Sequence, residues 1–203
     1  SEKYIIGELK KHFPDHGVLA EEGGGYEGRS GYRWYIDPLD GTTNFAHSFP
    51  VFAVSMGLEL NGEMVLGVVY DPTRNEMFAA EKGQGATLNG APMRVSQITT
   101  LKEALVATGF PSQRRHENPN IHFYHQFNMC SHGVRRPGSA ATDLAYVAAG
   151  RLDGFWEFNL HPWDVAAGKL LVAEAGGRVS DADGAPHTMQ DRKSTRLNSS
   201  HGY

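Results

Sequence analysis

The sequence has very little cysteine: Cys130 is the only one among 203 residues. A single cysteine excludes an intramolecular disulfide framework and is consistent with a reducing compartment. No histidine motif flanks this thiol, so we expect a buried and inert side chain. We therefore expect a cytoplasmic protein that is held together by an apolar core.

Long apolar runs and blocks of basic residues are also missing. No run approaches the roughly 20 apolar residues of a membrane span, and no signal peptide opens the chain. The formal net charge is −4 without a cluster of Lys or Arg, so the electrostatic footprint of a nucleic-acid-binding protein is absent. We expect neither a membrane nor a nucleic acid among the partners. A chain of 203 residues can bury a sizeable core as one domain or as two closely packed halves.

Both ends of the chain have unusual sequences. Residues 191–203 are polar and aperiodic and resemble a translated sequencing adapter, so we expect a non-native tail, with a natural disordered tail as the alternative. The expected domain is therefore residues 1–190, incomplete at its N-terminus. An amphipathic helix occupies the first residues and ends before Pro14, with the apolar stripe Tyr4, Ile5, Leu9 and Phe13.

Between the ends, strand and helix patterns alternate. Asn61-Gly62 is a strong hairpin turn between two of the strands. Because antiparallel strands come first and strand–helix units later, we expect a layered α+β fold with two sheets. Apolar runs predict strands at 18–20, 34–36, 51–60, 64–70, 76–80, 105–108 and 155–158. Helical spacing predicts a helix at 140–148, and helices are also expected at 119–129 and, between Pro162 and Gly176-Gly177, at 163–175.

The most informative segment is 34–44, where an apolar run is followed by Asp37 and Asp40 and then by a Gly-Thr-Thr turn. An unpaired buried carboxylate is costly, so paired acids at the end of a buried strand indicate a cationic partner. A hard divalent cation with oxygen ligands is the natural one. The turn that follows offers backbone N–H groups and hydroxyls to a phosphate.

Further acids stand where other apolar elements end, namely Glu21, Glu22 and Asp164. Carboxylates gathered from separate segments repel one another unless cations neutralise them, and Mg²⁺ suits such a site because it also accepts phosphate oxygens. Two such ions about 4 Å apart can activate a water and stabilise the leaving oxygen of a phosphate ester. Taken singly, Asp164 is also explained as a helix cap, Asp37 as a turn residue, and the two glutamates as a solvated surface pair.

The histidines favour exposed positions on a helix over a zinc site. His122 and His125 are three residues apart and His116 is nearby, but no cysteine partner or HExxH spacing accompanies them. The three tryptophans are expected in the core, with Trp163 wedging the helix that begins beside Asp164.

Taken together, the acidic segments resemble the inositol monophosphatase family over about residues 1–190. Asp-Pro-Leu-Asp-Gly-Thr-Thr-Asn and Trp-Asp-Val-Ala-Ala-Gly look like its two signatures, in the right order. The resemblance implies an αβαβα sandwich with two sheets between helix layers. The segments that carry it are 19–22, 37–45, 162–168 and 174–177, with support from 67–72, 85–90 and 135–141.

The resemblance also implies roles for individual residues. Glu22 binds the first metal and helps to activate the attacking water, Asp37 bridges metals, and Asp40 and Asp164 hold the second metal. Thr42 orients the water. Two or three Mg²⁺ ions are implied. The complete set of implied metal ligands is Glu22, Asp37, the Leu39 carbonyl, Asp40 and Asp164, and the implied catalytic residues are Glu22, Asp37, Asp40 and Thr42.

For the substrate, the resemblance implies that N–H groups of Gly41 and Thr42 hold the phosphate. Gly138, Ser139 and Ala140 belong to the substrate-binding segment, and Glu157 accepts hydrogen bonds from sugar or inositol hydroxyls. Without the resemblance, the better explanation of Gly138-Ser139 is an ordinary helix N-cap, and that of Glu157 is a surface residue on an aromatic strand.

The implied activity is that of a Mg²⁺-dependent, Li⁺-sensitive phosphomonoesterase, in which water attacks phosphorus in line without a phosphoenzyme. Inositol 1-phosphate is the leading substrate. The alternatives are phosphatases of fructose 1,6-bisphosphate, histidinol phosphate or 3′-phosphoadenosine 5′-phosphate, and a fold-retaining partner protein of transcription or RNA machinery. The family also implies a homodimer, and it places one aspartate of the metal and water network upstream of Ser1.

Overall fold

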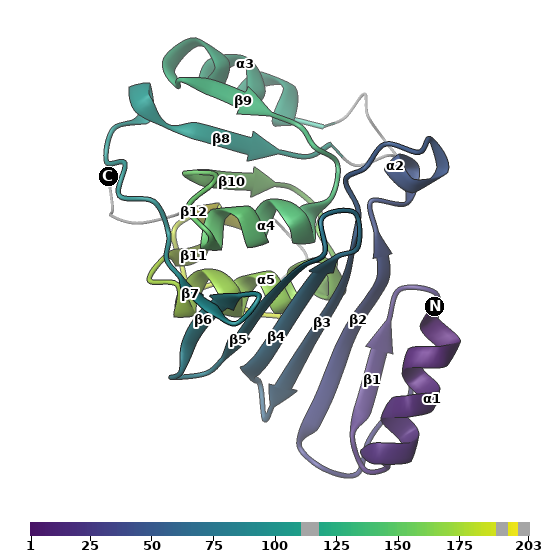
Figure 1. Ribbon diagram of the computed structural model, residues 1–203. Coiled ribbons are helices and arrows are strands. Elements are labelled where there is room, and N and C mark those ends of the chain that lie inside the picture. Colours follow the sequence, from purple (N-terminus) through teal and green to yellow (C-terminus); the bar gives the residue numbers. More distant parts are fainter. Residues whose placement is uncertain (111–117, 190–194, 199–203) are drawn as a thin grey trace.

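The computed structural model describes residues 1–110, 118–189 and 195–198. Helices and sheets stack in alternating layers (Figure 1). Helices α4 (Ala140–Ala148) and α5 (Pro162–Glu174) lie between two sheets, and α1 (Glu2–His12) and α3 (Asn120–Cys130) cover the outer faces. The expected αβαβα sandwich is thereby confirmed.

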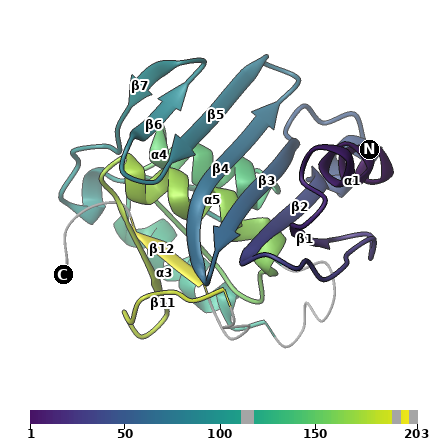
Figure 2. The ribbon, with the colours of Figure 1, turned by 90° about the horizontal axis from the view of Figure 1, so that it is seen from below.

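The larger sheet has seven strands in chain order, and all its neighbours are antiparallel except the parallel pair β1 and β2. At the turn between β3 and β4, Asn61 and Gly62 both have positive φ, 51° and 88°, which confirms the predicted hairpin. Figure 2 shows this sheet from below with α4 and α5 behind it. The strands are β1 (Gly17–Ala20), β2 (Tyr32–Asp40), β3 (Ala53–Leu60), β4 (Glu63–Asp71), β5 (Glu76–Glu81), β6 (Gly85–Leu88) and β7 (Ala91–Met93).

The smaller sheet has five strands in the order β11-β12-β10-β8-β9. Two short helices, α2 (Thr42–Ala46) and the 3₁₀ turn η1 (Leu101–Glu103), lie in the connections. The five strands are β8 (Leu105–Thr108), β9 (Gly133–Arg135), β10 (Gly154–Glu157), β11 (Arg178–Asp181) and β12 (Thr195–Asn198).

Strand β12 lies within the segment that the sequence predicts to be a non-native tail. Its backbone pairs antiparallel with both β10 and β11, so this part of the tail is inside the sheet and not outside the fold. The free N–H and C=O groups of a strand edge accept any extended chain, and a pattern of side chains does not reveal that pairing. The non-native origin of residues 191–203 stays a prediction.

The core lies where α4 and α5 pack against the larger sheet. Leu144, Val147 and Leu171 are fully buried there. Glycines allow the close approach: a Cβ on Gly67 of β4 would lie 2.7 Å from the Ala167 carbonyl of α5, and one on Gly168 would lie 2.5 Å from Cβ of Leu144. The position of α5 on the sheet is therefore fixed by backbone contact, and with it the position of the acid at its N-terminus.

Most of the predicted elements are present, but the prediction for Cys130 is wrong. Its side chain is exposed at the last residue of α3, because the outer face of that helix is not covered in the described chain. His122 and His125 are exposed on the same helix, as expected, and His116 lies outside the described residues. Trp34 and Trp156 are buried in the core, whereas Trp163 is only half-buried.

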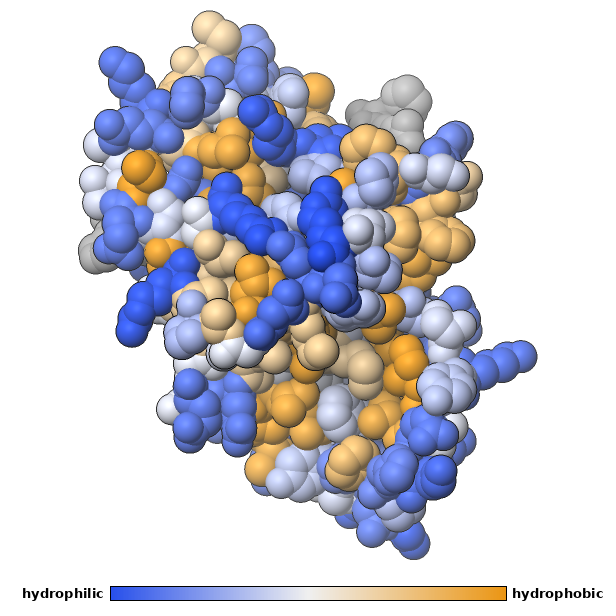
Figure 3. Space-filling view, viewed as in Figure 1, coloured by the Kyte–Doolittle hydropathy of each residue, from blue (hydrophilic) through white to orange (hydrophobic). Residues whose placement is uncertain are grey.

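The outer surface mixes polar and apolar side chains. Figure 3 shows apolar groups gathered on the lower part of one face, where strands of the larger sheet lie in Figure 1. Among the helices of the described residues, none is both long and apolar enough to cross a membrane.

Candidate active site

Strand β2 continues through both acids that the sequence places after its end. Asp37 pairs with Ser55 of β3 and Asp40 with Ala53, and the register shifts between the two acids. Pro38 lies within the shift and has no N–H to give to the ladder. Asp37 is only 2% exposed, and its Oδ1 accepts the Leu39 N–H at 3.0 Å. An irregularity of this kind re-aims side chains at the edge of a site.

The turn after β2 is held in one conformation by its own side chains. Gly41 has φ +89°, and a Cβ there would lie 2.8 Å from the Val51 carbonyl, so the position requires glycine. Thr42 Oγ1 donates to the Leu39 carbonyl at 3.0 Å. The structure thus brings together the hydroxyl and the carbonyl that the resemblance places beside the metals.

Asn44, which sequence reasoning missed, connects this turn to a distant segment. Its Nδ2 donates to the Val51 carbonyl at 2.7 Å and to the Pro137 carbonyl at 2.8 Å. The end of β2 is thereby tied to the turn that precedes α4. The only sequence signal was its place in the Gly-Thr-Thr-Asn run.

The N-terminus of α4 holds the carboxylate of Asp40. Ser139 Oγ donates to Asp40 Oδ2 at 2.7 Å, and the Ala141 N–H donates to the same oxygen at 2.6 Å. Ser139 also caps α4 by accepting the Thr142 N–H at 3.4 Å. The segment of Gly138, Ser139 and Ala140 therefore lies beside Asp40, and Ser139 binds that acid directly.

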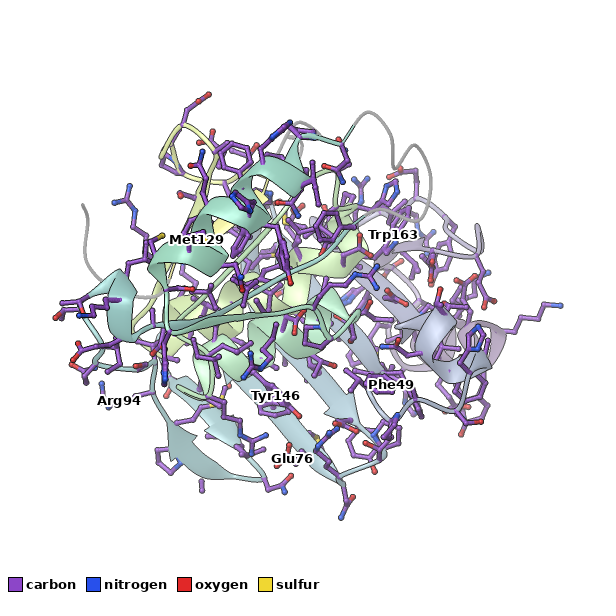
Figure 4. The ribbon with its side chains drawn as sticks, turned by 90° about the horizontal axis from the view of Figure 1, so that it is seen from above. Phe49, Glu76, Arg94, Met129, Tyr146 and Trp163 are labelled. Carbon is purple, nitrogen blue, oxygen red and sulfur yellow. The ribbon has the colours of Figure 1, made fainter. Side chains whose placement is uncertain are left out.

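The N-terminus of α5 holds the third acid. Asp164 Oδ2 accepts the N–H of His161 at 2.7 Å, so Asp164 makes the capping contact considered from the sequence. The His161 ring stacks on Trp163 with 4.8 Å between ring centroids (Figure 4 labels Trp163). This stacking holds the residues that begin α5.

The three acids interact electrostatically. Burial raises the pKa of Asp37 to about 9, with further contributions from Asp40 and Glu21. Burial and the same two neighbours raise the pKa of Asp164 to about 7, against the opposing effect of the His161 N–H. Burial also raises the pKa of Asp40, although Ser139 and Ala141 oppose it. These carboxyls therefore share one region of low polarity in which a cation is favoured.

The glutamate that faces this region is Glu21. Its N–H donates to the Ile36 carbonyl at 3.2 Å, one residue before Asp37, and its charge raises the pKa values of Asp37, Asp40 and Asp164. The Glu22 backbone instead donates its N–H to Glu2 Oε2 at 2.8 Å. The structure therefore favours Glu21 over the predicted Glu22 as the fourth acid, a choice that two adjacent glutamates in a sequence do not settle.

Glu2 fixes the loop that carries these glutamates. It is 3% exposed, and its Oε1 accepts the Gly24 N–H at 3.0 Å in addition to the bond from Glu22. Sequence reasoning missed this residue, whose position on the buried face of α1 was the available signal.

Two more acids, Glu157 and Asp143, interact electrostatically with Asp40. Burial raises the pKa of Glu157, at the end of β10, to about 8, with contributions from Asp40 and Asp164. Asp143 of α4, which sequence reasoning missed, is 1% exposed, and its Oδ1 has no hydrogen-bond partner in the described chain. Burial raises its pKa well above the usual value, followed by the charges of Glu157 and Asp40.

The donor set fits a hard cation. Carboxylate oxygens and the Leu39 carbonyl are the ligands that Mg²⁺ prefers, and the carboxyls with raised pKa values are those that a cation would stabilise in the charged form. Asp37 and Asp164 each accept an N–H group on one carboxylate oxygen, which leaves the other oxygen for an ion. In residues 1–110, 118–189 and 195–198, no three His, Cys, Asp or Glu side chains are arranged as a metal-binding cluster.

Comparison with known sequences gives a family. A model of the inositol monophosphatase family matches residues 1–201. An inositol-1-monophosphatase of Mesorhizobium japonicum is 50% identical over 193 residues, which cover 94% of this chain and 73% of that protein. The Nus factor SuhB of Pseudomonas aeruginosa is 48% identical over 196 residues, which cover 94% of this chain and 72% of that protein.

Comparison with solved structures gives the same fold. An inositol monophosphatase from Anabaena superposes with a TM-score of 0.92 at 44% identity, covering 98% of this chain and 79% of that chain. The extragenic suppressor protein suhB of Bartonella henselae superposes with a TM-score of 0.90 at 45% identity, covering 97% of this chain and 76% of that chain.

Proposed function

Because the chain belongs to the inositol monophosphatase family, we propose that it is a Mg²⁺-dependent phosphomonoesterase acting on a small polyol or sugar phosphate, first of all inositol 1-phosphate. The observation that carries the proposal is the position of Asp37 and Asp40 at the end of β2, where the N-terminus of α4 binds Asp40, together with pKa values of Asp37, Asp40 and Asp164 that burial and neighbouring acids raise. A cluster that disfavours its own charge is suited to binding a divalent cation.

Five groups would hold the metal ions: Glu21 in place of Glu22, Asp37, the Leu39 carbonyl, Asp40 and Asp164. The family is generally Mg²⁺-dependent, and two or three ions are proposed here. Bound Mg²⁺ supplies Lewis-acid charge that lowers the pKa of a water and stabilises the leaving oxygen.

The residues around the ions would orient the attack. Glu21 and the Thr42 hydroxyl hold the water that attacks phosphorus, with Glu21 positioned to accept its proton. The N–H groups of Gly41 and Thr42, at the start of α2, bind phosphate oxygens. The rigid glycine turn and the Thr42–Leu39 hydrogen bond support this arrangement, because they fix the backbone before substrate arrives.

The substrate alcohol would lie toward Glu157. A glutamate whose pKa is raised to about 8 by burial and acidic neighbours can both donate to and accept from hydroxyls near neutral pH. For Gly138, Ser139 and Ala140, the contacts favour an action on substrate through Asp40, since Ser139 binds that carboxylate directly.

A panel of phosphate esters tests the proposal. We expect phosphate release from inositol 1-phosphate to require Mg²⁺, to fall when Li⁺ is added, and to exceed release from fructose 1,6-bisphosphate, histidinol phosphate and 3′-phosphoadenosine 5′-phosphate. Faster release from another ester would replace inositol 1-phosphate as the proposed substrate. Phosphate release that persists in a chelator would overturn the metal-dependent mechanism.

The relatives named Nus factor SuhB favour a second candidate, a role as a Nus factor that uses the fold for binding. Complementation of a bacterial strain that lacks its own Nus factor SuhB tests this role. Growth restored equally by the wild type and by Asp40→Asn would support binding without catalysis, whereas no restoration by either would exclude it.

We also propose a homodimer. Light scattering after size-exclusion chromatography should give twice the chain mass, and the mass of a single chain would contradict it.

A further inference from the structure

A buried ring of hydrogen bonds joins Thr108, Asn120 and Trp156, the residue that precedes Glu157. Thr108 ends β8 and is 0% exposed, and Asn120 begins α3 and is also 0% exposed. Trp156, which precedes Glu157 on β10, is 5% exposed. Polar groups buried to this degree are retained only where hydrogen bonds satisfy them.

The hydrogen bonds of these three residues close a ring. Thr108 Oγ1 donates to the Trp156 carbonyl at 2.6 Å and accepts from Asn120 Nδ2 at 2.8 Å. The indole N–H of Trp156 donates to Asn120 Oδ1. Each side chain thus has its partner inside the ring, and such satisfied networks rigidify the groups they join.

The ring also fixes the strand beside the carboxyl group of Glu157. Asn120 Nδ2 donates to the Gly109 carbonyl at 2.7 Å. The Glu157 carboxyl lies so close to Gly109 that a Cβ there would overlap it. The Glu157 carboxyl therefore lies against the backbone of Gly109, and the backbone of Glu157 follows directly after the Trp156 carbonyl. The ring binds both the Gly109 carbonyl and the Trp156 carbonyl, and so it fixes Glu157 from two sides.

We propose that Thr108 and Asn120 are positioning residues for Glu157, and through it determine how well the enzyme selects phosphate esters that carry hydroxyl groups. The inference rests on the proposed function, in which Glu157 contacts the substrate alcohol. Neither residue touches the reacting phosphate. Their loss shifts the carboxyl and weakens alcohol binding, while the metal-binding acids on β2 and α5 stay in place.

The test compares Thr108→Val, which keeps the shape and removes the hydroxyl, with Thr108→Ser, which keeps the hydroxyl. Two substrates are used: inositol 1-phosphate, with hydroxyls for Glu157, and p-nitrophenyl phosphate, with none. Val106→Ala is the matched control, because Val106 is buried in the same strand and its side chain has no part in the ring. Glu157→Gln, alone and combined with Thr108→Val, shows whether the effect passes through Glu157.

We expect Thr108→Val to raise KM for inositol 1-phosphate about tenfold, which is the scale of losing one hydrogen bond between Glu157 and the substrate alcohol. KM for p-nitrophenyl phosphate should stay unchanged. Thr108→Ser should restore the wild-type value, and Thr108→Val should add nothing to Glu157→Gln. Val106→Ala should lower the unfolding midpoint without changing either KM.

Two failures are distinguishable. If Glu157→Gln leaves KM for inositol 1-phosphate unchanged, the proposed substrate contact of Glu157 is wrong. If Glu157→Gln raises this KM but Thr108→Val leaves it unchanged, or raises the KM values of both substrates alike, the positioning role is wrong.

Discussion

At the scale of single residues, the site depends on acids whose desolvation is offset by a few fixed hydrogen bonds. Asp40 accepts hydrogen bonds from the Ser139 hydroxyl and the Ala141 N–H, and Asp164 accepts one from the His161 N–H. The presence of these acids could be predicted from the sequence, because their motifs are local. Glu21 could not be distinguished from Glu22, because the choice depends on a hydrogen bond from the turn after β1 to Ile36 of β2. Nor could Asp143 be found, since nothing local marks a helical aspartate as buried.

The two adjacent glutamates provide a matched pair of substitutions. Glu21→Gln should lower kcat for phosphate release at least about 100-fold, the usual effect of removing a general base, because glutamine cannot accept the proton of the attacking water. Glu22→Gln should change kcat less than about twofold, since only its backbone is held in place. Steady-state kinetics at saturating Mg²⁺ measures both, and a larger loss for Glu22→Gln would restore the sequence-based assignment.

At the scale of elements, the packing of α5 on the larger sheet sets the position of Asp164 at the start of that helix. Hairpins and amphipathic helices could be predicted from local patterns, so β3, β4 and α5 were expected near their observed bounds. Strand β12 was not expected, because its place is set by the edges of two strands distant in sequence. The exposure of Cys130 was missed for a similar reason, as nothing in its own segment says which face of α3 is covered.

The contact between β4 and α5 makes Gly67 a sensitive position. Gly67→Ala should destabilise the fold by about 1–3 kcal/mol through overpacking, because the new Cβ would lie 2.7 Å from the Ala167 carbonyl. Gly7→Ala in α1 is the control: no atom lies within 4 Å of its Cβ, and alanine should stabilise the helix by about 0.5–1 kcal/mol. Urea unfolding measures both, and equal stability of the two variants would contradict close packing of α5.

At the scale of the whole molecule, the buried acids link stability to pH and to metal. Burial raises the pKa of Asp37 to about 9, of Glu157 to about 8 and of Asp164 to about 7. The native state therefore holds protons that the unfolded chain has already released. Without metal, the stability from these groups is fully present below the unfolded pKa values and is lost as pH rises through about 7 to 9.

Thermal unfolding at about pH 6 and about pH 9, with a chelator or with Mg²⁺, tests this linkage. In chelator the unfolding midpoint should fall as pH rises. Mg²⁺ binds the deprotonated carboxylates of the native state, so its stabilising shift should be larger at the higher pH. A shift that is absent at both pH values, or larger at the lower one, would contradict a carboxylate metal site.

The most direct measurement is the initial rate of phosphate release from inositol 1-phosphate as a function of Mg²⁺ concentration. It would be made for the wild type, for Asp40→Asn, and for Asp183→Asn as an exposed control of the same chemistry. We predict a rate that rises from zero to saturation with Mg²⁺ in the wild type and in Asp183→Asn, and that stays at background in Asp40→Asn. Equal release in the chelator, or an undiminished rate in Asp40→Asn, would contradict a metal-dependent phosphatase site built around β2.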